Sequence, residues 1–201
     1  MNGAPFTRPP IFIDRDGTLI EEVHYLSDLA HMRLIAGAAD AIARANAAGH
    51  PVVVASNQSG VARGIITDAF ARESGVHLTA MLAGQGARLD GYYYCPYHPD
   101  GQPPFNMEHP DRKPGHGMLL RAARDLALHL KGGCMVGDKL ADVDTGAELG
   151  VLPILVRTGY GRESEAELQG QPERLKRFQG RGGMVFDALP QALDWFVAHC
   201  Q

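Results

Sequence analysis

Short apolar runs that end in polar residues alternate with helical segments along this chain, and this alternation limits its fold more than any other feature. Apolar or aromatic runs of strand length cover 11–14, 51–55, 92–94, 134–137, 152–156 and 184–186. Segments with helical spacing of apolar residues cover 37–48, 67–82, 117–131, 142–149 and 190–199. Strands that are apolar throughout are typical of parallel sheets covered by helices on both faces. The sequence therefore predicts an α/β fold with a doubly wound, mostly parallel sheet.

Two segments fall outside this alternation. Residues 95–114 are rich in proline and contain several histidines and acids, so we expect a loop there. Residues 159–183 are polar, charged and rich in glycine, and the sequence predicts neither a structure nor a function for them. A length of 201 residues favours a single domain over 1–201 that includes the proline-rich loop.

Composition excludes several classes of partner. The net charge of −4 gives no reason to expect nucleic acid as a partner, because proteins that bind its backbone are usually basic. The longest apolar runs are far shorter than the ~20 residues that cross a bilayer, and residues 1–10 lack the apolar segment of a signal peptide. Three scattered cysteines fit a reducing compartment. We expect a cytoplasmic protein without a membrane partner, and we favour a monomer.

Four polar clusters lie next to the predicted strands and helices. DRDGT at 14–18 follows the first strand, SNQSG at 56–60 follows the second, and GDKLAD at 137–142 follows the fourth. RKP at 112–114 precedes a predicted helix. Because parallel strands point the same way, we expect the clusters at their carboxyl ends to meet at one edge of the sheet, where such folds bind ligands.

The residue types in these clusters favour phosphoryl chemistry. Several carboxylates in one pocket would repel one another, and a hard cation such as Mg²⁺ would relieve that repulsion. Lys113, the Ser56 hydroxyl and nearby backbone N–H groups suit the oxygens of a phosphoryl group. Of Asp14 and Asp16, one carboxylate can act as a nucleophile and the other as a general acid and base.

Simpler interpretations exist for each cluster alone. Any of the clusters could be a solvated turn or a helix cap, and D-x-D-G also opens a calcium-binding loop. That calcium loop requires Glu at its twelfth position, which Tyr25 occupies here. The four clusters together, in this order, favour a catalytic site over independent turns.

Taken together, DRDGT, SNQSG, RKP and GDKLAD resemble the four motifs of haloacid dehalogenase superfamily phosphatases, over about residues 10–159. The segments SNQSGVARG, YYYCPYHPDG, RKPGHGM and VGDKLADV are similar to the subgroup of heptose bisphosphate and histidinol phosphate phosphatases. This resemblance implies a Rossmann-like fold with short loops in place of a cap domain. It also implies a magnesium-dependent phosphatase that removes the 7-phosphate of D-glycero-D-manno-heptose 1,7-bisphosphate through an aspartyl-phosphate. The alternative is histidinol phosphate or another small phosphorylated metabolite.

The resemblance also implies roles for individual residues. Asp14 would be the nucleophile, Asp16 the general acid and base, and Ser56 and Lys113 the phosphoryl-binding residues. Asp14, the carbonyl of Asp16 and Asp138 would bind Mg²⁺, with Asp142 in support. The expected substrate contacts are Glu22, Val23, His24, Tyr25, Asn57, Gln58, Arg112 and Lys139.

The family pattern is broken in one place. Its members commonly hold a structural zinc through Cys-x-His and a later Cys-x-Cys, and only Cys95 of that set is present here. Tyr97 occupies the histidine position, and His109 and Asp111 occupy the later cysteine positions. Zinc on Cys95, His98, His109 and Asp111 is one interpretation, and a zinc-free loop is the other.

Functions outside metabolite hydrolysis fit less well. A nucleic-acid 3′-phosphatase would need a basic surface, and a non-catalytic scaffold would be expected to lack some of the aspartates or Lys113. A phosphotransferase could use the same intermediate, but the expected absence of a cap favours transfer to water.

Overall fold

The computed structural model of the chain describes residues 6–200. Residues 1–5 and residue 201 lie outside the described residues. The expected absence of a signal peptide was based on residues 1–10, so half of that segment is not described.

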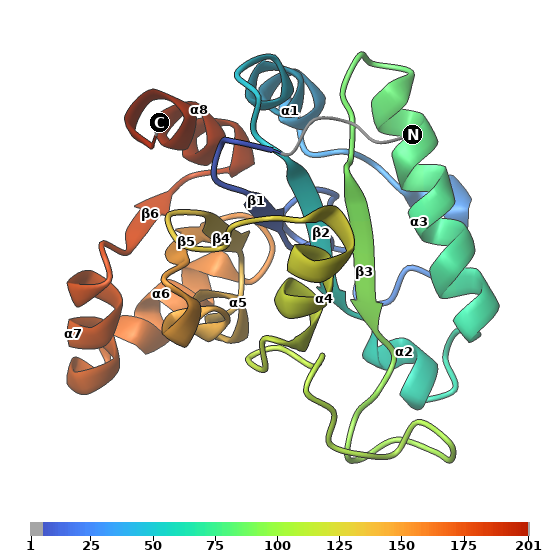
Figure 1. Ribbon diagram of the computed structural model, residues 1–201. Helices are drawn as coiled ribbons and strands as arrows, with labels where there is room; N and C mark the ends of the chain where they lie inside the picture. The colour runs from blue at the N-terminus through green and yellow to red at the C-terminus, as the bar shows by residue number, and fades with distance from the viewer. Residues whose placement is uncertain (1–5, 201) are drawn as a thin grey trace.

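A six-stranded, fully parallel sheet forms the centre of the protein, in the order β3-β2-β1-β4-β5-β6 (Figure 1). The strand order reverses beside β1, since the chain moves outward first to one side and then to the other. This arrangement confirms the predicted doubly wound fold. The strands are β1 Ile11–Ile13, β2 Val52–Asn57, β3 Gly91–Cys95, β4 Cys134–Gly137, β5 Leu152–Val156 and β6 Met184–Phe186.

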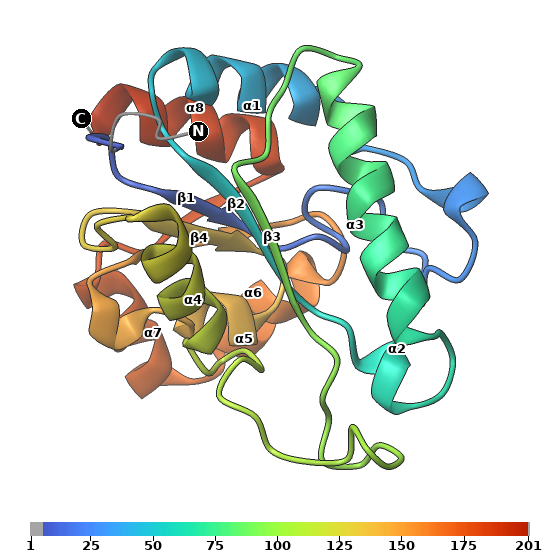
Figure 2. The ribbon, with the colours of Figure 1, turned by 45° about the vertical axis from the view of Figure 1, so that its right-hand side comes forward.

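Helices cover both faces of this sheet (Figure 2). Alternate residues of a strand point to opposite faces, so Ile11 and Ile13 join the core under α1, α3 and α8, whereas Phe12 packs with α4 on the other face. A third cluster joins Leu155 of β5 to α5, α6 and α7. The helices are α1 Ala38–Ala47, α2 Ser59–Ala62, α3 Asp68–Ala83, α4 Gly117–Leu126, α5 Leu140–Asp144, α6 Gly161–Gln169, α7 Pro172–Gly180 and α8 Leu189–His199.

Two predicted helices are shorter than expected. The helix predicted over 117–131 ends at Leu126, because Ala127 adopts the left-handed conformation (φ 52°) and its N–H caps the carbonyl of Ala123. The helix predicted over 142–149 is interrupted at Gly146 (φ 82°), which separates α5 from a short 3₁₀ turn, η2, at Ala147–Leu149.

The polar segment 159–183 contains two helices, α6 and α7. Each helix has one narrow apolar side. Leu168 of α6 and Phe178 of α7 are buried in the same cluster as Leu155. So few apolar positions were too weak a signal for a helix prediction, although Pro172 stands at a favourable first position of α7.

Only short loops stand where a cap domain could be inserted. Between β1 and α1 the chain forms a loop with one 3₁₀ turn, η1, at Leu29–His31. No helix within residues 6–200 is both long and apolar enough to cross a bilayer.

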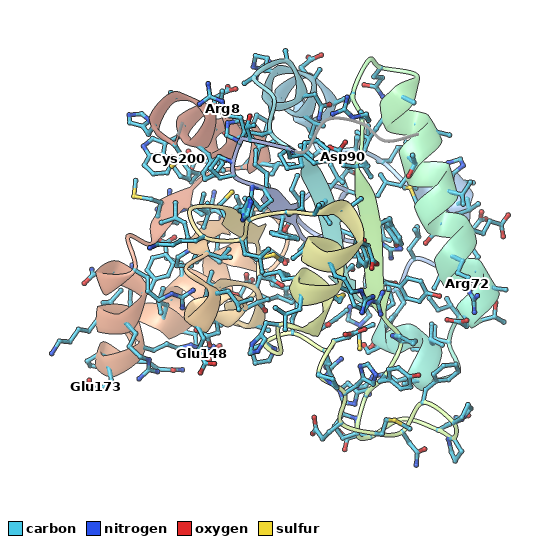
Figure 3. The ribbon with its side chains drawn as sticks, viewed as in Figure 1. Arg8, Arg72, Asp90, Glu148, Glu173 and Cys200 are labelled. Atoms are coloured by element: carbon cyan, nitrogen blue, oxygen red, sulfur yellow. The ribbon has the colours of Figure 1, made fainter. Side chains whose placement is uncertain are left out.

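The opposite, amino-terminal edge of the sheet has a structural role. Asp90, labelled in Figure 3, precedes β3, and its carboxylate accepts a hydrogen bond from the N–H of Val52 at 2.9 Å and one from Arg88 at 2.8 Å. Cys200, also labelled there, ends α8, and like Cys95 and Cys134 it is a free cysteine. Asp90 and Cys200 lie away from the carboxyl-end clusters.

Candidate active site

Three aspartates meet at the carboxyl edge of the sheet. Asp14 follows β1, Asp138 follows β4, and Asp142 lies in the first turn of α5. Since β1 and β4 are neighbours in the sheet, these buried carboxylates bring one oxygen each within 4.8 Å of one another. The convergence expected from the strand ends is therefore present.

Gly17 lets the chain turn tightly over these carboxylates. Its φ of 78° lies in the left-handed region, where side chains are strained. A Cβ atom at this position would also collide with the carboxylate of Asp138 and with the backbone of Gly159. The DRDGT turn therefore needs glycine for two separate reasons.

Asp138 has one carboxylate oxygen without a partner. Its Oδ2 accepts a hydrogen bond from the N–H of Tyr160 at 2.8 Å, whereas Oδ1 is buried and has no hydrogen-bond partner among the described residues. Burial, and then the charge of Asp14, raise the pKa of Asp138 to about 8. Burial also raises the pKa of Asp14, although Lys113 opposes this. A hard divalent cation would neutralise both groups, so the donor set fits Mg²⁺.

Lys113 is a fully buried cation beside Asp14. Its Nζ lies 2.7 Å from Oδ1 of Asp14, 2.7 Å from Oδ1 of Asp142 and 2.7 Å from the carbonyl oxygen of Ala55. An ammonium group has three N–H donors, so each one has a partner. Burial lowers the pKa of Lys113, but the two carboxylates outweigh that effect and raise it.

Asn57 and Asp142 hold the neighbours of this cation in place. The side chain of Asn57 donates to the carbonyl oxygen of Lys113 at 3.0 Å and accepts from its N–H at 3.0 Å. Asp142 Oδ2 accepts from the N–H of Lys139 at 2.9 Å. Asp142 therefore supports Lys113, while Asn57, expected as a substrate contact, also fixes the backbone of Lys113.

Asp16 is bound by a buried arginine that the sequence analysis did not single out. Arg15 Nη2 lies 2.9 Å from Oδ1 of Asp16, and Gln58 Nε2 donates to Oδ2 at 2.8 Å. Arg15 also donates to Ser74 at 2.7 Å and to Tyr92 at 3.2 Å. Burial raises the pKa of Asp16, but the charge and hydrogen bonds of Arg15 outweigh this and lower it. The position of Arg15 between two aspartates was the one sign of its role in the sequence. Its other partners are distant in the sequence, so the role could not be predicted.

Gln58 connects Asp16 to the second motif. Its Nε2 also donates to Ser56 Oγ at 2.8 Å, and its Oε1 accepts from Arg15 at 2.8 Å. Ser56 is the last residue but one of β2 and is buried. The first two motifs are thus joined through one amide side chain.

A cavity of about 350 Å³ opens above these residues. Val23, an expected substrate contact, is not among its lining residues and is 38% exposed. The other expected substrate contacts do line the cavity: Glu22, His24, Tyr25, Asn57, Gln58, Arg112 and Lys139.

Tyr160 joins two sides of this cavity and was missed in the sequence. Its ring lies 4.7 Å from Nζ of Lys139, and its hydroxyl is 3.2 Å from Nδ1 of His24. Lys139 Nζ is in turn 3.7 Å from Glu22. His24 adopts a left-handed φ of 69°, which is uncommon for a residue other than glycine. Tyr160 lies in the segment for which no function was predicted.

The four zinc candidates do not form a site in this structure. Within residues 6–200, the three aspartates described above are the only group whose donor atoms lie within 4.8 Å of one another. No three of the zinc candidates meet that condition. The candidates are Cys95, His98, His109 and Asp111.

Comparisons with known proteins agree with this fold. The HAD-hydrolase-like family matches residues 111–190. D-glycero-beta-D-manno-heptose-1,7-bisphosphate 7-phosphatase of Photorhabdus laumondii is 39% identical over 166 residues, covering 79% of this chain and 86% of the relative. D-glycero-D-manno-heptose-1,7-bisphosphate 7-phosphatase of Thermosynechococcus vestitus is 38% identical and covers 96% of this chain and 97% of the relative.

Among solved structures, D,D-heptose 1,7-bisphosphate phosphatase of B. bronchiseptica, complexed with magnesium and phosphate, has a TM-score of 0.80. It is 31% identical and covers 94% of this chain and 98% of that chain. The fold, the strand-end carboxylates and these relatives define the class: the chain belongs to the haloacid dehalogenase-like hydrolase family and is a phosphatase. Within that family, the two relatives described above are named as heptose bisphosphate phosphatases.

Proposed function

We propose that this phosphatase removes the 7-phosphate of D-glycero-D-manno-heptose 1,7-bisphosphate with Mg²⁺ as its cofactor. One observation carries the proposal. Asp14 lies at the end of the central strand with Lys113 Nζ 2.7 Å away, beside the unpartnered Oδ1 of Asp138. The names of the relatives from Photorhabdus laumondii and Thermosynechococcus vestitus support the choice of substrate.

In the proposed reaction, a carboxylate oxygen of Asp14 attacks the phosphorus atom, and the bond from phosphorus to the sugar oxygen breaks. Asp16 donates a proton to that leaving oxygen. Asp16 then takes a proton from a water molecule, whose oxygen attacks the aspartyl-phosphate and releases phosphate and free Asp14. Ser56 and Lys113 bind the phosphoryl oxygens in both steps, Lys113 by exchanging one of its three present partners for a phosphoryl oxygen, so the transferred group stays in one place.

Asp14, Asp138 and the backbone carbonyl of Asp16 would hold the Mg²⁺ ion, and Asp142 supports them through Lys113. When bound, Mg²⁺ supplies positive charge that neutralises both the aspartates and the phosphoryl oxygens. The unpartnered Oδ1 of Asp138 is the observation that favours this ligand set.

A basic group among the residues that line the cavity suits a second phosphate. It consists of Arg63, Arg112 and His98, and burial, followed by the charges of Arg112 and Arg63, lowers the pKa of His98. Nδ1 of His98 accepts from the N–H of Asp100 at 3.1 Å, so a neutral ring carries its proton on Nε2. That nitrogen lies 3.2 Å from an N–H group of Arg63, which leaves two donors facing each other. A phosphate oxygen could accept from both, whereas the ammonium group of histidinol phosphate would be repelled here.

We also propose that the chain acts as a cytoplasmic monomer on sugar phosphates and not on nucleic acid. Its three free cysteines fit a reducing compartment, and its net charge of −4 disfavours a polyanion. Light scattering after size exclusion tests the monomer, and a 3′-phosphorylated oligonucleotide tests the substrate class.

Phosphate release from heptose bisphosphate, histidinol phosphate and that oligonucleotide, each with Mg²⁺ or with chelator, tests the proposal. We expect the heptose bisphosphate to be the best substrate, with activity that requires Mg²⁺ and is abolished by Asp14→Asn. Asp194→Asn, a change at an exposed carboxylate on α8, is the matched control. Full activity of Asp14→Asn would refute the mechanism, and a preference for histidinol phosphate would refute the substrate.

A further inference from the structure

We infer that the segment 95–113, which joins β3 to α4 and carries Lys113 into the site, is held by side-chain contacts within the chain and takes no zinc. This inference does not depend on which sugar phosphate is hydrolysed. It concerns a loop of this chain in which three of the four zinc positions of the family hold other residues, namely Tyr97, His109 and Asp111.

The potential zinc donors point to separate partners. The thiol of Cys95 is buried and lies 4.0 Å from the carbonyl oxygen of Tyr97. Nδ1 of His98 accepts from the N–H of Asp100, and its Nε2 faces the guanidinium group of Arg63, whose positive charge would repel a zinc ion there. Neither of these two candidates is therefore placed to bind zinc.

The other two candidates form the contacts that close the loop. The ring of His109 stacks on that of Tyr97, with centroids 4.3 Å apart and planes 15° from parallel. Nδ1 of His109 accepts from the N–H of Asp111 at 3.1 Å. The carboxylate of Asp111, whose side chain is only 8% exposed, pairs with Arg121 of α4. At these positions, where the family has zinc ligands, this chain therefore has an aromatic stack and an ion pair.

The position of these contacts explains why the loop needs them. The Tyr97–His109 stack joins the beginning of the loop to its end, and the Asp111–Arg121 pair attaches that end to α4. Lys113 lies two residues beyond Asp111, and Asn57 binds its backbone from β2. Lys113 is thus fixed between two attachments, and loosening one of them should displace its ammonium group from Asp14. Arg121 and His109 are therefore positioning residues.

Metal content is the first test. The untagged protein, purified from a zinc-supplemented culture, should contain far less than one zinc ion per chain. A zinc-selective chelator, added in the presence of Mg²⁺, should leave both the unfolding temperature and the activity unchanged. One zinc ion per chain, or a lower unfolding temperature with the chelator, would overturn the inference.

Variants of His109 separate stacking from metal binding. His109→Phe keeps an aromatic ring against Tyr97 but cannot bind zinc, whereas His109→Ala removes both functions. We expect His109→Phe to have nearly the same unfolding temperature and kcat/KM as the wild type. In His109→Ala, the unfolding temperature should fall by several degrees and kcat/KM should fall several-fold. Equal losses in the two variants would contradict a stacking role.

Variants of Arg121 test the ion pair. Arg121→Met leaves a nearly buried carboxylate unpaired, so we expect the unfolding temperature to fall by about 4–10 °C. At 25 °C, where the variant remains folded, kcat/KM should fall about tenfold because Lys113 moves. Arg121→Lys should restore most of both values. Arg124→Met removes an exposed pair on the same helix and should change neither value. An Arg121→Met protein with unchanged activity would show that the pair does not position Lys113.

Discussion

Replacing Asp138 by asparagine should stabilise the metal-free protein although it removes catalysis. Asp138 is 0% exposed, and its pKa of about 8 compares with an ordinary value of 3.8. Because the pKa is higher in the folded than in the unfolded chain, the contribution of this group to stability is complete below pH 3.8 and is lost as the pH rises towards 8.

The size of the effect follows from that shift. Each pKa unit corresponds to about 1.4 kcal/mol, so converting Asp138 from the ionised form of the unfolded chain to the mostly protonated form of the folded chain costs at most about 5 kcal/mol at pH 7.5. Relaxation of the site and entry of water reduce the expected cost to about 2–4 kcal/mol. Asparagine has no charge to keep buried, and its side-chain oxygen can still accept from the N–H of Tyr160. The free energy of unfolding should therefore rise by about 2–4 kcal/mol at pH 7.5.

Urea unfolding in chelator, followed by the fluorescence of Trp195, measures this difference. It should shrink to below about 1 kcal/mol at pH 4, because this pH is close to the pKa of Asp138 in the unfolded chain and protonating the buried group then costs little. Added Mg²⁺ should stabilise the wild type more than the variant. Asp40→Asn, at an exposed position of α1, is the control and should have little effect. A destabilised Asp138→Asn protein at pH 7.5, or a difference that does not depend on pH, would refute this account of the carboxylate cluster.

Three further predictions concern neighbouring residues. Arg15→Met should lower the free energy of unfolding in urea by about 3–5 kcal/mol, because it leaves Asp16 without its buried cation; a change below about 1 kcal/mol would contradict this. Arg112→Ala should raise KM for a sugar bisphosphate by about 10-fold or more and KM for a monophosphate much less, and an equal rise for both would exclude a contact with the second phosphate. Gly17→Ala should reduce kcat at least about 100-fold. Gly86→Ala, with a similar φ of 77° but no atom within 4 Å of the added Cβ, controls for backbone strain and should stay active.

The sequence predicted the sheet well because its strands are apolar throughout. A run such as 52–54 has no polar face, so it can only be buried between two layers of helices. The helices α6 and α7 were not predicted, because Leu168 and Phe178 are too few to give a periodic signal. The early end of α4 also escaped prediction, because Ala127 does not carry the sequence signal of a helix terminus.

The site was predictable where chemistry lies directly at a strand end. Asp14 and Asp138 converge because parallel strands bring their carboxyl ends together, and Lys113 joins them from the loop before α4. Arg15 and Tyr160 were not identified, since their roles depend on partners that only the folded chain brings near, such as Ser74, 59 residues from Arg15. The catalytic and binding roles of the site residues remain predictions that the variants above would test.

The central position of β1 also affects how motion is distributed around the site. Its amides are enclosed by β2 on one side and β4 on the other, whereas β3 and β6 form the two edges of the sheet. Local opening of a sheet begins at such edges, and central strands exchange their amide hydrogens only when the whole domain unfolds. Asp14, the proposed nucleophile, is therefore expected to stand on the slowest-exchanging part of the molecule. The cavity rim around His24 and Tyr160 consists of loops, which can fluctuate and admit a sugar without disturbing the position of Asp14.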